Sequence, residues 1–276
     1  MRYIEKDLIF YEIMKYPVPA QSDFFVLWKK IDTKDTYDNK KFSREKEGQY
    51  LQNYIEKIKK YSKLYKSIPF VSEIFLCNSI SFNALKQDSD IDIFIVAKEK
   101  SIWRARFFSM LYFTFLWLKR SLSNKKEKFC LSFYITQDNK NLYPIILKDK
   151  VDIYLAYWLA HLVPLYQERL DSWSMYKNNP WFKSYLPNHP EKYCINLWIK
   201  TVHGSTKSKE ILEKIFGWAF WLLVEKLVKT LRKPILKKKT KALWDKAKRI
   251  VISDKMLKFH DDKREEVAQL HEYFIK

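Results

Sequence analysis

The chain has 276 residues, of which 47% are hydrophobic and 17% aromatic, so it is too apolar to be disordered as a whole. Only three glycines occur, which argues against folds built on a glycine-rich phosphate loop, such as dinucleotide-binding and Walker-type folds. The formal net charge of +20 favours polyanions such as nucleic acid, nucleotides or anionic lipid, although a lysine-rich proteome explains it equally well.

The N-terminal part of the chain predicts short helices followed by one long amphipathic helix. Residues 3–15 and 23–30 have the pattern of short helices, and the polar stretch 31–43 is expected to be a linker. We therefore treat residues 1–43 as a short helical N-terminal segment. A long helix is predicted over 44–66, with apolar residues near helical spacing at Tyr50, Leu51, Tyr54, Ile55, Ile58, Tyr61 and Leu64.

Three strand-like runs follow in the middle of the chain. Residues 71–77, 90–96 and 129–136 are short, apolar and bounded by polar turns, as is typical of buried strands. Between the second and third strands, an apolar helix is predicted over 101–119 and a basic loop over 119–128.

After residue 150, the patterns indicate helices alone. The fold class that we predict is α+β, with a small mixed β-sheet and flanking helices in residues 44–150 and an all-helical C-terminal domain in residues 151–276. The helices expected in this second part span residues 151–168, 191–202, 208–231, 240–250 and 262–275.

Two apolar runs, 107–118 and 215–224, raise the question of a membrane. Both are shorter than the roughly 20 residues that a spanning helix needs, so no transmembrane segment is predicted. We interpret both as buried helices; a helix that lies on a membrane surface is the alternative.

The cysteines and the N-terminus point to a cytoplasmic protein. Cys77, Cys130 and Cys194 are an odd and widely spaced set, with the spacing of neither a disulfide framework nor a zinc site. This fits a reducing compartment. The first residues lack the apolar core of a signal peptide.

The most informative residues are two aspartates in the second predicted strand. Because side chains alternate along a strand, Asp90 and Asp92 project from one face, while Ile91, Ile93 and Ile95 take the other. Two adjacent carboxylates repel each other unless a cation compensates them. Mg²⁺, or Mn²⁺ in its place, is the natural cation, because it prefers oxygen ligands and usually also binds substrate phosphates. Two such ions can stabilise the attacking and leaving oxygens of an in-line displacement.

The end of the first predicted strand supplies a second element. Ser79 follows this strand and starts a short helix, where backbone N–H groups and the hydroxyl are expected to bind a terminal phosphate.

These residues resemble the nucleotidyltransferase superfamily of DNA polymerase beta. Its signature is a strand, Gly-Ser, roughly ten residues, and then Asp-x-Asp inside an apolar strand. Ser79 matches the serine, Asp90 and Asp92 match the metal-binding pair, and Ser89 matches the serine that often precedes it. The resemblance covers about residues 70–136. It implies magnesium at the aspartates, and a nucleoside triphosphate held at Asn78, Ser79 and Ser89.

The chain departs from this signature in two places. The signature glycine is Asn78, the residue type that best tolerates a left-handed backbone after glycine. The family's third carboxylate usually lies on the next core strand, where the in-phase residue here is Ser132. Asp138, just past that strand, is the other candidate for the third metal position. Alternation is expected to place Cys130, Ser132 and Tyr134 on one face of this strand.

The resemblance leads to two functional hypotheses. In the first, the chain is an enzyme that transfers a nucleoside monophosphate from a nucleoside triphosphate to a hydroxyl acceptor that the sequence does not identify. In the second, a catalytically degenerate core binds nucleotide or nucleic acid without turnover. The basic region 226–249 is the candidate nucleic-acid surface in both cases, against a solvated helix end as the plain alternative.

Overall fold

The computed structural model describes most of the chain between residues 48 and 275. The expected helices of the N-terminal segment and the basic region 226–249, apart from positions 230 and 234, lie outside the described residues. The described residues are 48–81, 85–121, 123–171, 174–185, 199–217, 230, 234, 250–259 and 264–275.

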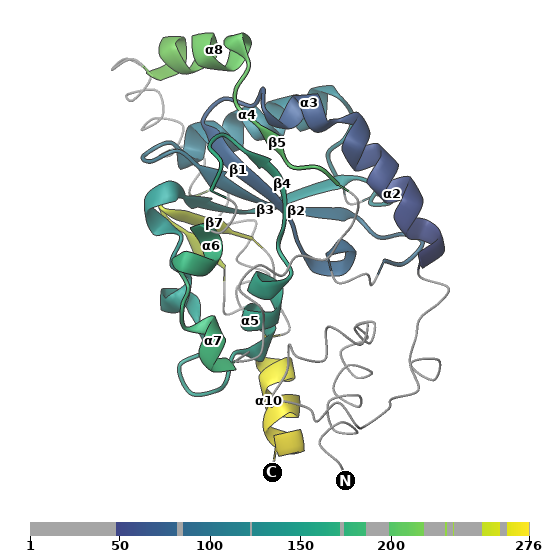
Figure 1. Ribbon diagram of the computed structural model, residues 1–276, viewed down its shortest axis with the longest axis vertical. Coiled ribbons are helices and arrows are strands. Elements are labelled where there is room, and N and C mark those ends of the chain that lie inside the picture. The colour runs from purple at the N-terminus through teal and green to yellow at the C-terminus, as the bar shows by residue number, and fades with distance from the viewer. Residues whose placement is uncertain are drawn as a thin grey trace.

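A mixed sheet of seven strands forms the centre of the described structure (Figure 1). The strand order is β5-β4-β1-β2-β3-β7-β6. Strands β2 and β3 are parallel, as are β4 and β5, and all other neighbours are antiparallel. The strands are β1 (Val71–Leu76), β2 (Ile91–Ala97), β3 (Phe129–Thr136), β4 (Val163–Gln167), β5 (Val202–His203), β6 (Val251–Ile252) and β7 (Met256–Lys258).

Helices cover both faces of this sheet, so the architecture is α/β in three layers. On one face lie α2 (Gly48–Lys60), α3 (Ser62–Tyr65) and α4 (Ile102–Phe115). On the other lie α5 (Ile153–Ala160), α6 (Ser174–Lys177), α7 (Phe182–Tyr185) and α10 (Arg264–Ile275). Helix α8 (Lys207–Gly217) runs along the end of the molecule near α3 and α4 (Figure 1). Short 3-10 helices span Asn78–Ile80, Gln137–Asn139 and Tyr143–Ile145.

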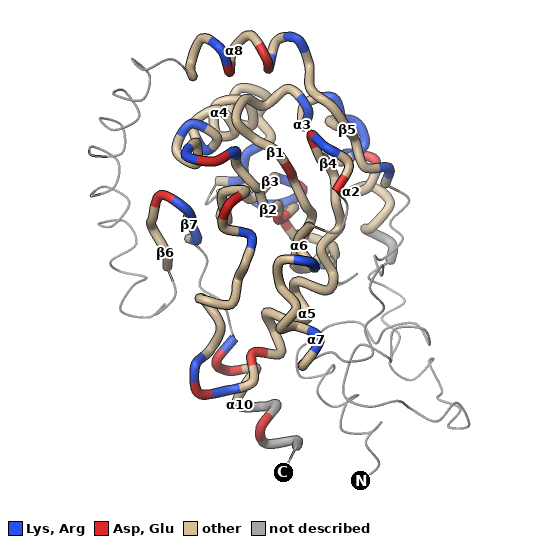
Figure 2. The backbone as a smooth tube through the Cα atoms, turned by 60° about the vertical axis from the view of Figure 1, so that its left-hand side comes forward, with Lys and Arg blue, Asp and Glu red and all other residues tan. Residues whose placement is uncertain are grey.

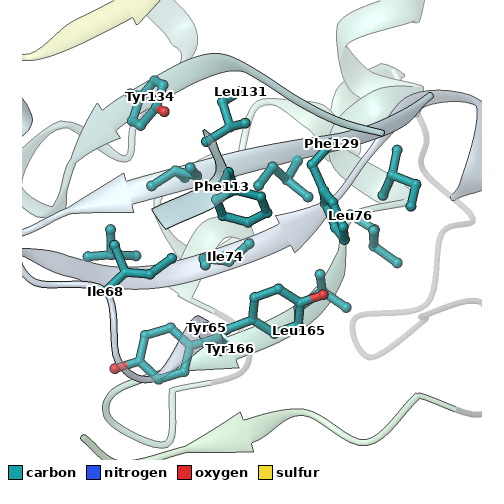
Figure 3. Close-up of a cluster of buried hydrophobic side chains, with 14 of the residues drawn as sticks. Tyr65, Ile68, Ile74, Leu76, Phe113, Phe129, Leu131, Tyr134, Leu165 and Tyr166 are labelled. Carbon is teal, nitrogen blue, oxygen red and sulfur yellow. The ribbon is translucent and has the colours of Figure 1, made fainter. Parts of the chain in front are cut away.

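The two hydrophobic cores follow from the alternation of side chains along β2. Ile91, Ile93 and Ile95 pack into the first core. Phe113 of α4 lies in the same core (Figure 3). Phe94 faces the second core, where its ring lies 5.1 Å from that of Trp158 on α5. The predicted placement of the isoleucines on one face is therefore confirmed. Each isoleucine contributes about 1.5–3 kcal/mol through its burial.

The three strands expected in the middle of the chain are confirmed, but the all-helical C-terminal part is wrong. Four strands, β4 to β7, lie after residue 150, and β4 and β7 pair with β1 and β3. The predicted helix 151–168 ends at Ala160, and the chain continues as β4. Periodicity cannot separate helix from strand in so continuous an apolar run, and Pro164 disfavours further helix. The sheet thus spans the boundary expected near residue 150.

None of the helices in the described residues has the combination of length and apolar character that crossing a membrane requires.

Candidate functional site

The pairing of β2 with β3 brings the two aspartates together with a cysteine. Asp90 directly precedes β2, and Asp92 is its second residue. In the parallel register, Asp92 lies opposite Cys130 of β3. One carboxylate oxygen of each aspartate and the Cys130 sulfur lie within 4.8 Å of one another. Asp92 and Cys130 are buried, and Asp90 is partly exposed. The expected convergence of the two carboxylates is therefore present.

An arginine that the sequence did not single out completes this cluster. Arg120 follows α4, and its backbone N–H donates to the carbonyl of Phe129 at 3.0 Å, which fixes it beside the start of β3. Its Nη1 donates to Asp90 Oδ2 at 2.5 Å and lies 3.6 Å from Cys130 Sγ. Burial lowers the pKa of Arg120, but the neighbouring Cys130 and Asp90 outweigh burial and raise this pKa above its ordinary value. The guanidinium is therefore a permanent cation next to Asp90.

The turn after β1 lies directly beside Asp92. The backbone N–H of Cys77 donates to the carbonyl of Asp92 at 3.1 Å. The next residue, Asn78, has a φ of 58°, and its carbonyl accepts from Ser81 Oγ at 2.9 Å. After glycine, asparagine is the residue type that best tolerates this left-handed backbone. Ser79 follows in the short 3-10 helix and is half-buried.

Ser89 closes the turn that leads into the site. Its hydroxyl oxygen accepts from the backbone N–H of Lys86 at 2.8 Å. Its carbonyl accepts from the hydroxyl of Tyr54 at 2.8 Å and from the N–H of Glu127 at 2.9 Å. Burial, and next the charge of Glu127, raise the pKa of Tyr54 to about 12, so this hydroxyl keeps its proton. The observed contacts of Ser89 hold the backbone that presents Asp90.

A bulge in β3 lies at Ser132, just beyond the residues that face the aspartates. Ile93 pairs with Leu131 and Phe94 pairs with Phe133, so Ser132 is an extra residue in β3. Strict alternation fails beyond the bulge, and Tyr134 packs into the first core with Leu131. The expectation that Tyr134 shares the face of the aspartates is therefore wrong.

The residue opposite Asp92 carries a thiol. Cys130 takes this position, and its Sγ donates to Ser132 Oγ at 3.5 Å. Ser132 thus contacts the cluster through Cys130 and does not lie opposite Asp92.

Asp138 lies at the opposite end of β3. It sits in the 3-10 helix Gln137–Asn139, and Lys255 forms an ion pair with it at 2.8 Å. This hydrogen-bonded ion pair lowers the pKa of Asp138 below its ordinary value. From Cys130 to Thr136, β3 covers about 20 Å at the usual rise of a strand. The chain does not bring Asp138 back to the aspartates.

A small cavity adjoins the cluster on the side of the second core. Its volume of about 90 Å³ is well below the 300–1,000 Å³ that is usual for ligand pockets. It accommodates a small group but not a whole nucleotide. Its lining includes Asn78, Ser132, Tyr154, Trp158, Lys258 and Arg264.

Sequence reasoning missed two members of the cluster, for different reasons. Cys130 was placed on the correct face, but the third position was assigned to Ser132, two residues further along the same strand. A pairing of Ile91 with Phe129 would have identified Cys130, because it sets Asp92 opposite Cys130. No sequence pattern marks Arg120, which lies in a loop with several other cations.

Comparison of the chain with protein-family models finds no match, and comparisons with curated proteins and with solved structures find none either.

Proposed function

We propose that this chain is a metal-dependent nucleotidyltransferase that transfers a nucleoside monophosphate from a nucleoside triphosphate to a hydroxyl acceptor. The observation that carries the proposal is the convergence of Asp90 and Asp92 beside the left-handed turn at Asn78 and Ser79. This arrangement offers carboxylate oxygens for a divalent cation and a backbone turn for the phosphates of the same ligand.

The donor atoms fit Mg²⁺ at the two aspartates but not at the third position. Magnesium prefers oxygen ligands, which Asp90 and Asp92 supply, whereas the sulfur of Cys130 suits softer metals. Arg120 shares Asp90 with any cation bound there. A bound magnesium would neutralise charge on the phosphates and on the attacking oxygen.

The reaction would proceed by in-line attack. The hydroxyl oxygen of the acceptor loses its proton to water and forms a bond to the α-phosphorus, the bond from this phosphorus to the β-bridging oxygen breaks, and pyrophosphate leaves. Ser79 and its backbone N–H would bind the terminal phosphates, and Arg120 would lie next to the metal-binding carboxylates. Nucleic acid is one candidate acceptor, because the region 226–249 is strongly basic.

A second candidate function is nucleotide binding without turnover. Cys130 favours it, because the position opposite Asp92 lacks the carboxylate that would act as base or metal bridge for the attacking hydroxyl. Arg120 also favours it, since a guanidinium already contacts Asp90. The two candidates share the binding site and differ only in product formation.

Calorimetric titration with nucleoside triphosphates and Mn²⁺ or Mg²⁺ tests the binding site. Asp90→Asn combined with Asp92→Asn should abolish metal-dependent binding and leave the circular dichroism spectrum unchanged. Ser79→Ala should weaken binding by about 1–2 kcal/mol, the scale of a hydrogen bond to a charged group. Asp138→Asn is the matched control, because this carboxylate lies at the far end of β3. Unchanged affinity in the double variant would refute the proposed site.

Turnover requires a separate measurement. The protein is incubated with labelled nucleoside triphosphates, Mg²⁺ and a cell extract, and both pyrophosphate and labelled products are followed. Label transferred by the parent but not by the double variant supports the transferase. Binding without transfer under these conditions supports the second candidate instead.

A further inference from the structure

Exposed apolar side chains gather at one end of the molecule, on α4, the turn after it and α8. Nine large hydrophobic residues are exposed among the described residues, and seven belong to this group. The remaining two, Tyr143 and Leu170, lie elsewhere, so the group is a local feature and not a general property of the surface. We call it the α4–α8 apolar surface; it consists of Phe107, Leu111, Phe115, Leu116, Trp117, Ile211 and Ile215.

The geometry of α4 makes this surface continuous along one helix face. Phe107, Leu111 and Phe115 follow one another at intervals of four residues, so they line one side of α4. Other residues of α4, Phe108 and Phe113 among them, face the first core. The exposed stripe is therefore separate from the face of α4 that packs into the first core. Its tip is the most exposed part, because Phe115 is 80% exposed and Trp117 is 83% exposed.

Helix α8 extends the same surface. The ring of Phe216 packs against that of Phe108 with centroids 5.0 Å apart, and Arg104 Nη1 donates to the carbonyl of Phe216 at 3.0 Å. Both helices lie at the same end of the molecule (Figures 1 and 2). Ile211 and Ile215, again four residues apart, are both at least half exposed.

The segment that carries the tip of this surface is rich in cations, and some of them lie beside the tip. From Lys100 to Lys128 the sequence holds eight lysine and arginine residues and a single acid, Glu127, which forms an ion pair with Lys57. Lys128 Nζ donates to the carbonyl of Trp117 at 2.6 Å, so a cation lies directly beside the exposed indole. Lys125 and Lys126 are exposed in the same loop.

We propose that the α4–α8 apolar surface docks onto a membrane rich in anionic phospholipid. Helices that lie in a membrane interface combine aromatic and aliphatic residues on one face with lysine and arginine at its border. The apolar side chains would enter the boundary between headgroups and acyl chains, and the cations would contact lipid phosphates. This inference does not depend on the proposed nucleotidyl transfer.

Charge complementarity favours anionic lipid over the other occupants. Two copies of the chain joined through this surface would bring their cationic loops together, because a two-fold interface places the same patch on both partners. A nucleic acid would satisfy the cations, but it would leave the isoleucine, leucine and phenylalanine stripe with little to contact.

Co-sedimentation with lipid vesicles tests the proposal. The full chain should bind vesicles of phosphatidylglycerol mixed with phosphatidylcholine, bind phosphatidylcholine vesicles far more weakly, and dissociate as salt is raised. Phe115→Ser combined with Trp117→Ser should weaken binding more than about tenfold, the loss expected for removing buried aromatic side chains. Lys125→Glu combined with Lys126→Glu should weaken binding to the anionic vesicles by about tenfold or more.

Matched controls distinguish binding through this surface from nonspecific adsorption to the vesicles. Leu170→Ser removes an apolar side chain that is 78% exposed outside the surface, so this variant should bind like the parent. Asp90→Asn combined with Asp92→Asn should also leave vesicle binding unchanged. Thermal unfolding is compared for all variants, and the serine variants should melt close to the parent because they alter exposed positions.

Several outcomes would overturn the proposal. They are the absence of binding to anionic vesicles, equal binding to both vesicle types, and an equal loss in Leu170→Ser. A dimer in lipid-free buffer that Phe115→Ser with Trp117→Ser dissociates would assign the surface to a second copy. A large fall in melting temperature in that variant, with vesicle binding retained, would assign it to another part of this chain.

Discussion

The site at the start of β2 and the ion pairs buried around the sheet use the same residue types in different ways. In the buried clusters, opposite charges meet. Glu73 pairs with Lys140, and Asp152 pairs with Arg264. At the site, two carboxylates converge beside one arginine, because Asp90 and Asp92 lie together and Arg120 pairs with Asp90.

A third buried cluster shows how thoroughly opposite charges are matched. Lys209 is fully buried and lies 3.2 Å from Glu168 and 3.9 Å from Glu213. Its Nζ also donates to the carbonyl of Val71 and to the hydroxyl of Tyr166. Burial lowers the pKa of Lys209, against the influence of both glutamates. This cluster attaches α8 to the start of β1.

The balance of acidic and basic groups in a charge cluster therefore indicates whether the cluster is structural or a candidate binding site. Burying an ion without a partner of opposite sign is costly, so structural clusters in a core are matched pairs. Carboxylates kept close together beside the surface are typical of sites that bind a cation. The comparison therefore separates the candidate site, where two carboxylates lie beside one arginine, from clusters in which each acid pairs with a lysine or an arginine.

The largest expected effect comes from breaking a matched pair. Asp152→Asn should lower the free energy of unfolding by about 3–5 kcal/mol, because it leaves Arg264 buried without its counter-charge. Asp90→Asn should change it by less than about 1 kcal/mol, because the pair with Arg120 is partly exposed. Urea denaturation measures both values. Similar losses in the two variants would remove the distinction between structural and functional clusters.

The next effect concerns the third position of the site. Cys130→Asp should strengthen Mn²⁺ binding by about tenfold, since it adds a carboxylate opposite Asp92 in place of a thiol. Ser132→Asp should have a smaller effect, because Cys130, and not Ser132, lies opposite Asp92. Titration with Mn²⁺, followed by electron paramagnetic resonance, distinguishes the two variants. A larger gain from Ser132→Asp would mean that Ser132, and not Cys130, faces the cation.

A smaller effect is the pH dependence of the cluster that holds α8. Burial raises the pKa of Glu168, but the neighbouring Lys98 and Lys209 outweigh burial and lower it from its ordinary value of 4.5. The unfolded chain therefore takes up this proton first as the pH falls. The stabilisation is present above pH 4.5 and is lost through the more acidic range.

Glu168→Gln tests this dependence. The variant should be less stable than the parent at pH 6, and the difference should shrink at pH values below 4. Melting temperatures measured across this range give the two curves. Parallel curves would show that Glu168 has the same pKa in the folded and unfolded chain.

The smallest effect is expected at the far end of β3. Asp138→Asn should change the free energy of unfolding by no more than about 0.5 kcal/mol, because Lys255 is 63% exposed and Asp138 is 34% exposed. It should leave metal binding at Asp90 and Asp92 unchanged. A clear loss of metal affinity would place Asp138 within reach of the site.

Local patterns predicted the strands that carry the site. The apolar runs at 71–77, 90–96 and 129–136 are strands, and the isoleucines of β2 share one face as expected. Helix α10 also lies within the expected 262–275. These elements follow from periodicity, which depends on neighbouring residues alone.

Features that depend on distant partners were not predictable in the same way. The bulge at Ser132 arises from pairing with β2, and it turns Tyr134 into the first core. Arg120 reaches Asp90 because Phe129 binds its backbone. Strands β6 and β7 are short and gain their stability from the edge of β3, so the sequence around 251–258 carries little signal of its own.

The order of the strands also has a consequence for biosynthesis. One side of β3 is covered by β2, which is made shortly before it, whereas the other side pairs with β7, which leaves the ribosome much later. Until then, the apolar β3 is an open edge that can pair with other chains. A nascent chain interrupted between β3 and β7 should therefore be prone to aggregation and depend on chaperones.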